Sequence, residues 1–241
     1  MVTNILIPMA GNGSRFAEKG YVLPKPLISV FGRPMISWVT GNFKEIPEKK
    51  FIFICRTEHE EKYNISDKLK ELVGECHVVF VDKLTEGAAC TTLLAKHLID
   101  NDDSLIIANS DQFVVWSEKE FYDFAAHNDA SILTFPSQAV KWSYAKLDDN
   151  QYVQEVAEKK VISDKATVGI YHWKKGSDYV KYAESMIAKN IRVNNEFYVC
   201  PVFNEAIKDS KKIKIFDIPR ESMWGLGTPE DLETFLKDYR V

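Results

Sequence analysis

The sequence of 241 residues has no long hydrophobic run. A membrane-spanning helix needs about 20 consecutive apolar residues, and no segment approaches that length. The first residues, Met-Val-Thr-Asn-Ile-Leu-Ile-Pro, have no basic start before an apolar stretch, which argues against a secretory signal. We therefore expect a cytoplasmic protein with no membrane partner.

The four cysteines form no Cys-x-x-Cys pair, so neither a disulfide framework nor a zinc knuckle is indicated. The five histidines show no metal-ligand spacing, and no Ser-His-Asp or Cys-His arrangement indicates a nucleophilic enzyme. The sequence also lacks a basic excess, because 31 Lys and Arg face 35 Asp and Glu and give a net charge of −4. This balance argues against a broad nucleic-acid-binding surface but allows an anionic ligand held by a few local cations.

Short apolar runs alternate with helical segments through the first 136 residues. Runs typical of buried strands lie at Val2–Ile7, Phe51–Cys55, Val78–Val81, Leu105–Ala108 and Ile132–Phe135. Helices are predicted at Pro34–Asn42, Glu58–Val73, Ala88–Leu98 and Ser117–His127, the last opened by a Ser-x-x-Glu capping box. This alternation predicts a Rossmann-like α/β fold, with a mostly parallel sheet and helices on both faces.

After about residue 136 the strands follow one another more closely. Strands are predicted at Tyr144–Leu147, Val153–Val156, Val168–His172 and Ile213–Ile218, and helices at Ser177–Lys189, Val199–Lys208 and Pro229–Leu236. We interpret residues 137–241 as an insertion followed by a return to the main sheet. No flexible linker separates the two halves, so we expect one domain over residues 1–241 and no further domain after the closing helix.

A long glycine-rich and basic segment separates the first predicted strand from the first predicted helix. Loops of more than about 15 residues are uncommon in compact domains and are usually functional or disordered. Glycines let backbone amides approach a ligand, and Arg15 and Lys25 add positive charge, which suits a polyphosphate. No Gly-Lys-Ser/Thr completes a Walker A loop, and Phe16 replaces the third glycine of a dinucleotide fingerprint. The segment contains Met9-Ala10-Gly11-Asn12-Gly13-Ser14-Arg15-Phe16 and Leu23-Pro24-Lys25-Pro26-Leu27.

These residues, with Val30-Phe31-Gly32-Arg33-Pro34-Met35-Ile36, resemble the sugar-phosphate nucleotidylyltransferases, which transfer NMP from an NTP to a phosphate on an acceptor. The resemblance covers most of the chain and is strongest over residues 2–40 and 84–112. It implies a nucleotide-binding half at residues 1–136 and an acceptor-binding half at 137–241. It also implies that Met9 to Ser14 bind the nucleotide, and that Arg15 and Lys25 are the catalytic cations that hold the triphosphate.

Two further segments follow predicted strands. The resemblance implies that Leu84-Thr85-Glu86-Gly87-Ala88-Ala89 passes the nucleobase, with Glu86, Gly87 and Ala88 in the nucleotide site. In Ala108-Asn109-Ser110-Asp111-Gln112, Ser110 belongs to the same site and Asp111 matches the family's metal-binding aspartate. One carboxylate suits Mg²⁺, which prefers one or two carboxylates together with substrate phosphates. Because ligands in open α/β sheets bind at the carboxyl ends of the strands, we expect these segments to converge.

The acceptor side is implied by the resemblance alone. Residues 155–163 and 168–171 look like the family's acceptor segment, in which Lys159 contacts the acceptor phosphate and Gly169 lies in the binding site. Glu196 matches a position that binds sugar hydroxyls. A late stretch departs from the family, because Trp224-Gly225-Leu226-Gly227-Thr228 has glycine where many relatives carry a second metal-binding aspartate. Asp217, Glu221, or phosphates and water are the substitutes we consider.

The expected reaction is Mg²⁺-dependent transfer of NMP to a phosphorylated acceptor with release of pyrophosphate. Residues 85–94 and 109–116 look like a branch associated with capsule and surface polysaccharides, which favours CTP over UTP or dTTP. The acceptor is then a sugar 1-phosphate or a small compound such as phosphoglutamine. Two alternatives stay open: a GT-A glycosyltransferase, although Asn109-Ser110-Asp111 is not Asp-x-Asp, and a non-catalytic nucleotide-binding module. The sequence does not determine the oligomeric state, and a homo-oligomer is one of the possibilities.

Overall fold

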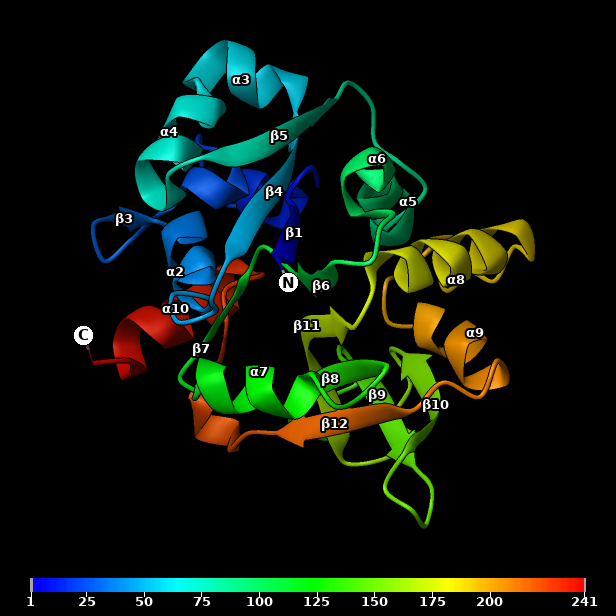
Figure 1. The fold of residues 1–241 in the computed structure, drawn as a ribbon. Helices are drawn as coiled ribbons and strands as arrows, with labels where there is room; N and C mark the ends of the chain where they lie inside the picture. Colours follow the sequence, from blue (N-terminus) through cyan, green and yellow to red (C-terminus); the bar gives the residue numbers. More distant parts are fainter. Residues whose placement is uncertain (1, 241) are drawn as a thin grey trace.

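The structure, a computed structural model, describes residues 2–240. A nine-stranded sheet runs through the molecule in the order β10-β9-β11-β6-β1-β4-β5, with β8 also beside β11 and β12 beside β8 (Figure 1). Its strands are β1 (Thr3–Pro8), β4 (Lys49–Arg56), β5 (Cys76–Val81), β6 (Ser104–Ala108), β8 (Ala130–Pro136), β9 (Ser143–Leu147), β10 (Val153–Glu158), β11 (Lys165–Trp173) and β12 (Ile213–Asp217). Two small ribbons, β2 (Ser29–Val30) with β3 (Arg33–Pro34) and β7 (Gln112–Val114) with β13 (Met223–Gly225), lie outside it.

The direction of the strands divides the sheet. β1 pairs in parallel with β4 and β6, and β4 pairs in parallel with β5. β11 enters antiparallel to β6 and brings the β9–β10 hairpin with it, and β12 returns in parallel beside β8. The Rossmann-like α/β fold that the sequence predicts is confirmed, and β12 lies beside β8 in the same sheet.

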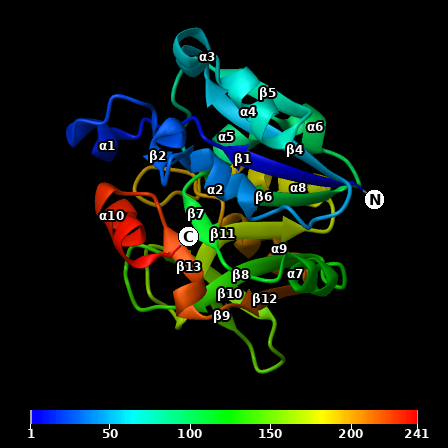
Figure 2. The same ribbon diagram turned by 90° about the vertical axis from the view of Figure 1, so that its left-hand side faces the viewer.

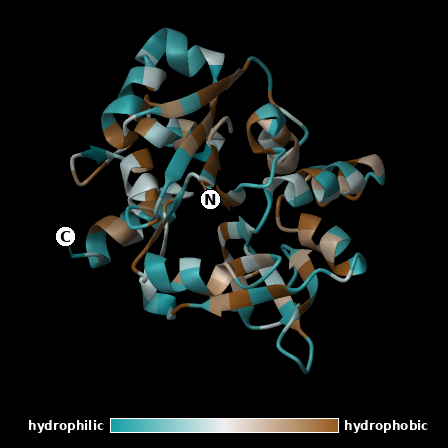
Figure 3. Ribbon diagram, viewed as in Figure 1, coloured by the Kyte–Doolittle hydropathy of each residue, from teal (hydrophilic) through white to brown (hydrophobic). Residues whose placement is uncertain are grey.

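Alternating side chains bury both faces of the sheet. Leu6 and Ile52 belong to one hydrophobic cluster, while Ile5 and Phe51, their neighbours in sequence, belong to another. Successive side chains of a strand point to opposite faces, so near-continuous apolar strands need helices on both sides. Figure 2 shows the helices on the two sides of the sheet, and in Figure 3 brown segments appear both on the strands and on the helices that pack against them.

The helices cover these faces in two groups. The first cluster takes residues from α5 (Ala88–Leu93), α6 (Lys96–Ile99), α8 (Gly176–Ala188) and α9 (Val202–Lys208). The second takes residues from α2 (Met35–Gly41), α4 (Ile65–Val73) and α7 (Glu118–Ala125), and α3 (Thr57–Tyr63) contacts β4. Within residues 2–240, no helix has both the length and the apolar character needed to cross a membrane.

Two predicted helices are each split into two. The helix predicted over residues 58–73 is α3 and α4, because Asn64 takes a left-handed conformation (φ 51°) between them. The helix predicted over residues 88–98 ends at Leu93 and resumes at Lys96. The helix predicted from Val199 begins only after Pro201.

The segment predicted as one long loop is partly ordered into short elements. It contains α1 (Ser14–Glu18), a 3₁₀ turn η1 (Lys25–Leu27) and the β2–β3 ribbon. A third hydrophobic cluster joins Phe16 of α1 to Trp38 of α2 and to Phe235 of the C-terminal helix α10 (Pro229–Asp238). The Trp38 and Phe235 rings meet edge to face at 5.2 Å. Buried aromatic contacts therefore hold in place part of the segment between β1 and α2, which the sequence predicts to be a loop.

Candidate active site

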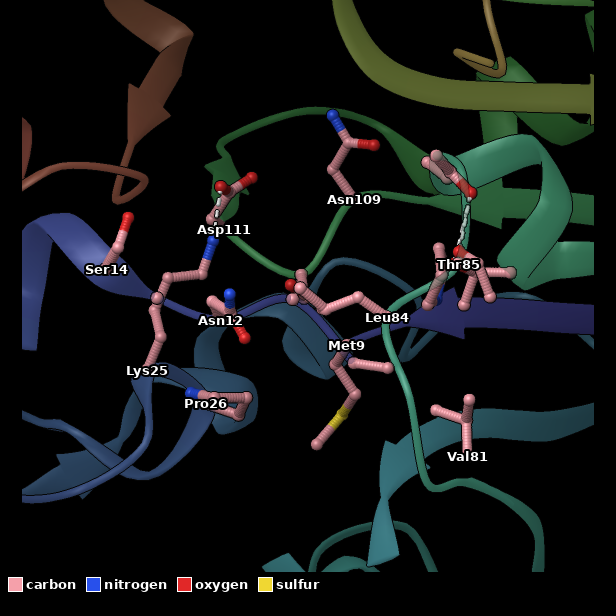
Figure 4. Close-up of a pocket in the computed structure, with 18 of the residues that line it drawn as sticks. Met9, Asn12, Ser14, Lys25, Pro26, Val81, Leu84, Thr85, Asn109 and Asp111 are labelled. Carbon is pink, nitrogen blue, oxygen red and sulfur yellow. Dashed lines mark hydrogen bonds and ion pairs between the residues drawn. The ribbon is translucent and has the colours of Figure 1, made fainter. Parts of the chain in front are cut away.

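Three segments meet at the carboxyl ends of β1, β5 and β6 and enclose a first cavity of about 480 Å³. The sequence predicts that the three segments meet at these carboxyl ends. Figure 4 shows Met9 and Asn12 from the first segment, Thr85 from the second, and Asn109 and Asp111 from the third. The sequence-predicted nucleotide residues on its wall are Met9, Ala10, Gly11, Asn12, Gly13, Ser14, Gly87, Ala88 and Ser110, together with Lys25 and Asp111.

Lys25 and Asp111 point toward each other across this cavity (Figure 4). The Lys25 ammonium donates to one carboxylate oxygen of Asp111 at 2.6 Å, and the two side chains are 19% and 20% exposed. Lys25 stands between Pro24 and Pro26 at the start of the 3₁₀ turn, so its backbone is tightly constrained. Charge and carboxylate are thus held in one place where a polyphosphate and a cation can meet.

Gly87 brings the segment after β5 against a distant loop. Its φ is 135°, and a Cβ there would lie 2.5 Å from the backbone nitrogen and oxygen of Phe197. The Phe197 amide donates to the Glu86 carbonyl at 2.8 Å, and the Ala89 amide donates to the Phe197 carbonyl at 2.9 Å. Only glycine permits this close backbone approach, which connects the predicted base segment to residues 196–197.

The two glutamates predicted for the site are placed differently from expectation. Glu86 does not line this cavity or the adjoining one. Its carboxylate instead pairs with the Arg192 guanidinium at 2.5 Å. Glu196, predicted on the acceptor side, lines this first cavity, and its carboxylate also interacts with Tyr198. The contact between Phe197 and Gly87 explains this position, since it draws Glu196 toward the segment after β5.

A second cavity of about 370 Å³ adjoins the first, and Ala88, Asn109 and Asp111 line both. Arg15 lies on this second cavity and not on the first, so the two predicted catalytic cations line different cavities. Lys159 also lines it, with its ammonium donating to the Tyr198 hydroxyl at 2.5 Å. The opposite charges Lys141 and Asp231 face this cavity as an ion pair at 2.7 Å.

Glu158 is a cavity residue that sequence reasoning missed. It ends β10 opposite Ser143 of β9, whose hydroxyl donates to its carboxylate. Burial raises the pKa of Glu158, and the Ser143 hydrogen bond and the nearby Lys159 act in the opposite direction. The signal that could have found it is its position directly before Lys159 in the same segment.

Three residues considered for the acceptor and metal sites do not reach a described cavity. Gly169 (φ 91°) lies behind Asn109, whose side-chain nitrogen would be 2.3 Å from a Cβ there, so this glycine makes room for Asn109 instead of a ligand. Asp217 is held by Thr134 and Lys165, and Glu221 lies in the 3₁₀ turn η2 (Arg220–Ser222). Neither carboxylate lines the first or second cavity, so neither replaces the missing late aspartate there.

A divalent cation at Asp111 fits the donors present. The carboxylate faces both cavities, and a Cβ on Gly227 would lie 2.7 Å from its oxygen, so glycine leaves that oxygen accessible. Among residues 2–240 no group of three or more His, Cys, Asp or Glu side chains could hold a metal. A single carboxylate suits Mg²⁺ shared with substrate phosphates, and it does not suit an all-protein cage.

Fold and cavities together define an α/β protein with a glycine-lined, cation-bearing ligand site at the ends of its parallel strands. The family model described as Nucleotidyl transferase matches residues 5–239, and the chain belongs to that family. Two curated relatives are the bifunctional protein GlmU of Thermoanaerobacter pseudethanolicus, 25% identical over 92% of this chain, and that of Desulfotalea psychrophila, 27% identical over 97%. The matches cover 48% and 69% of those proteins, so the chain spans about half the length of the first.

Solved structures of the same fold include a nucleoside-diphosphate-sugar pyrophosphorylase from Vibrio cholerae RC9, with a TM-score of 0.86 and 28% identity. The match covers 97% of this chain and 100% of that one. The inositol-1-phosphate CTP transferase of T. maritima has a TM-score of 0.75 over 99% of this chain, but its 12% identity makes it a likeness of fold alone.

Proposed function

We propose that the protein transfers a nucleoside monophosphate from an NTP to a phosphorylated acceptor and releases pyrophosphate. The observation that carries this proposal is the shared wall of the two cavities, because Asp111 and Asn109 border both. A nucleotide in the first cavity and an acceptor in the second would meet at this wall. Family membership over residues 5–239 supports the same reaction class.

In the proposed step an acceptor phosphate oxygen forms a bond to the α-phosphorus of the NTP. The bond between that phosphorus and the oxygen bridging to the β-phosphorus breaks, and pyrophosphate leaves with the electron pair. The attacking phosphate is already anionic near pH 7, so no general base is needed. Positioning and charge stabilisation supply the catalysis, and Lys25 and Arg15 provide fixed positive charge on either side of the shared wall.

Mg²⁺ is the proposed cofactor, held by Asp111 and by the nucleotide phosphates, and it would neutralise charge on them. On the acceptor side, Lys159 faces the phosphate and Glu158 offers a carboxylate to hydrogen-bond donors of the acceptor. The hydrogen bond from Lys159 to Tyr198 keeps its ammonium at the cavity wall.

CTP is the proposed nucleotide, with UTP and dTTP as alternatives, because residues 85–94 and 109–116 resemble a branch associated with capsule and surface polysaccharides. A sugar 1-phosphate or a small compound such as phosphoglutamine is the proposed acceptor. A role in polysaccharide synthesis follows from the same resemblance.

The deciding experiment is a matrix of four NTPs against sugar 1-phosphates and phospho-amino compounds, read by release of pyrophosphate. We expect one NTP and one acceptor class to stand out, and Asp111→Asn to abolish the response to Mg²⁺. Release that requires no acceptor phosphate, or turnover of nucleotide sugars instead of NTPs, would favour a glycosyltransferase or hydrolase. Nucleotide binding without turnover across the whole matrix would favour a non-catalytic module.

A further inference from the structure

Lys25 occupies the position at Asp111 that a metal cation would take. Its ammonium lies 2.6 Å from an Asp111 carboxylate oxygen, the same oxygen that faces Gly227. The Asp111 backbone is fixed, because its carbonyl accepts from the Leu226 amide at 2.7 Å. Lys25 is anchored by the flanking prolines, so only its long side chain is free to change partner.

The two side chains are about four-fifths buried, which makes a carboxylate without a counter-ion costly. Among residues 2–240, Lys25 is the only cationic side chain paired with Asp111. Lys25 can therefore leave Asp111 readily only when another cation arrives. It also needs a new anionic partner, because the same burial penalises an unpaired ammonium.

A triphosphate in the first cavity satisfies both requirements at once. Its phosphates offer Lys25 a new partner, since Lys25 lines that cavity beside the backbone of Gly11 and Gly13. The divalent cation that accompanies a triphosphate can then replace Lys25 at the carboxylate. Neither step is favourable alone. A divalent cation that binds Asp111 without a triphosphate leaves Lys25 without an anionic partner, and a Lys25 that moves to a triphosphate without a divalent cation leaves Asp111 without a counter-ion.

We propose that Lys25 is the built-in counter-ion of Asp111 in the nucleotide-free protein and moves to the triphosphate when the nucleotide binds, which opens Asp111 to a divalent cation. The cation and the triphosphate then bind cooperatively, and the coupling is reciprocal. This inference rests on the proposed function for the identity of its ligand, but its test does not depend on turnover.

The test is Mn²⁺ binding to the whole chain, measured by electron paramagnetic resonance with and without inorganic tripolyphosphate or α,β-methylene-CTP. We expect Lys25→Met to bind Mn²⁺ without triphosphate at least about ten-fold more tightly than the unchanged protein. A second substitution, Asp111→Asn, should remove this gain. Lys83→Met is the matched control, because Lys83 lines the same cavity without an ion pair among residues 2–240, and it should leave Mn²⁺ binding unchanged.

Lys25→Arg tests whether charge alone matters, and we expect it to suppress Mn²⁺ binding as Lys25 does. Melting curves identify any variant that fails to fold. If Lys25→Met does not fold, the unchanged protein decides the question, and equal Mn²⁺ affinity with and without tripolyphosphate overturns the inference. Equal Mn²⁺ affinity of the unchanged protein and Lys25→Met without triphosphate overturns the inference, as does a gain that survives Asp111→Asn. Cooperative Mn²⁺ binding with no pyrophosphate release in the matrix would refute the proposed reaction and leave this exchange standing.

Discussion

The two cavities are built in different ways. The first is lined mostly by backbone and small residues from three segments that each follow a parallel strand, and its charged groups are few. The second carries more charged and aromatic side chains, among them Arg15 of α1, Trp142, Glu158 at the end of β10, Tyr171 of β11, Tyr198 and Asp231 of α10. The side chains that a ligand would contact therefore differ in kind between the two cavities. Under the proposed function, nucleotide binding and acceptor choice would be assigned to different cavities.

The largest effect is expected from removing the positive charge of Lys25, which tests whether this charge in the first cavity stabilises the transition state. Lys25→Ala should lower kcat about 10²–10³-fold, the loss typical of removing one preorganised charge-stabilising group. Steady-state pyrophosphate release measures it, and a thermal melt checks the fold. Lys83→Ala, in the same cavity, should change kcat by less than about three-fold if position and not net charge matters. Equal losses of kcat in Lys25→Ala and Lys83→Ala would contradict the claim that the position of Lys25 matters more than the net charge of the cavity.

A second test concerns the pH dependence of stability, which we attribute to a buried histidine outside both cavities. His172 is buried on β11, where burial, assisted by nearby Lys174, lowers its pKa to about 4. The unfolded chain binds a proton at this position below about pH 6.5 and the folded chain only below about 4, so stability falls with pH between these values. The full loss is about 3 kcal/mol, and about 2 kcal/mol of it is expected by pH 5.

Urea unfolding at pH 7 and pH 5 measures that loss. His172→Gln should reduce the difference between the two pH values, and His127→Gln, on the exposed surface, should leave it unchanged. If His172→Gln keeps the full slope, another buried group carries the pH dependence.

A third test addresses the contact that ties the two cavities together. Gly87→Ala places a Cβ 2.5 Å from the Phe197 backbone at a φ of 135°. Strain and overpacking together should cost at least about 2 kcal/mol of stability and weaken nucleotide binding. Urea unfolding and a nucleotide titration measure these two effects. Gly11→Ala, with nothing within 4 Å of its Cβ position, is the control and should retain its stability.

The smallest expected effect concerns Glu196, which lines the first cavity and also interacts with Tyr198 of the second. Glu196→Gln should raise the KM for the nucleotide about ten-fold, the loss expected for one charged hydrogen bond. The KM for the acceptor should stay within about two-fold. The reverse pattern would return Glu196 to the acceptor site and blur the separation between the cavities.

The sequence predicts the first cavity well because its information is local. Gly11, Gly13 and Lys25 lie in one segment, and strand order alone brings Asp111 beside them. The second cavity escapes prediction because it depends on the register of β9 against β10 and on the seating of α10, which no short motif encodes. Asp231 was missed for this reason, whereas Glu158 could have been found from its place directly before Lys159. Asn64 was missed because a left-handed residue interrupts an otherwise continuous helical pattern.

The aromatic cluster of Phe16, Trp38 and Phe235 has a consequence for synthesis of the chain. Phe16 and Trp38 leave the ribosome early, but their partner Phe235 belongs to α10, the last helix described. Until α10 emerges, α1 lacks the surface that holds it in place, although the strands made earlier can already pair. A chain in which α10 has not yet been made therefore exposes the aromatic face formed by Phe16 and Trp38.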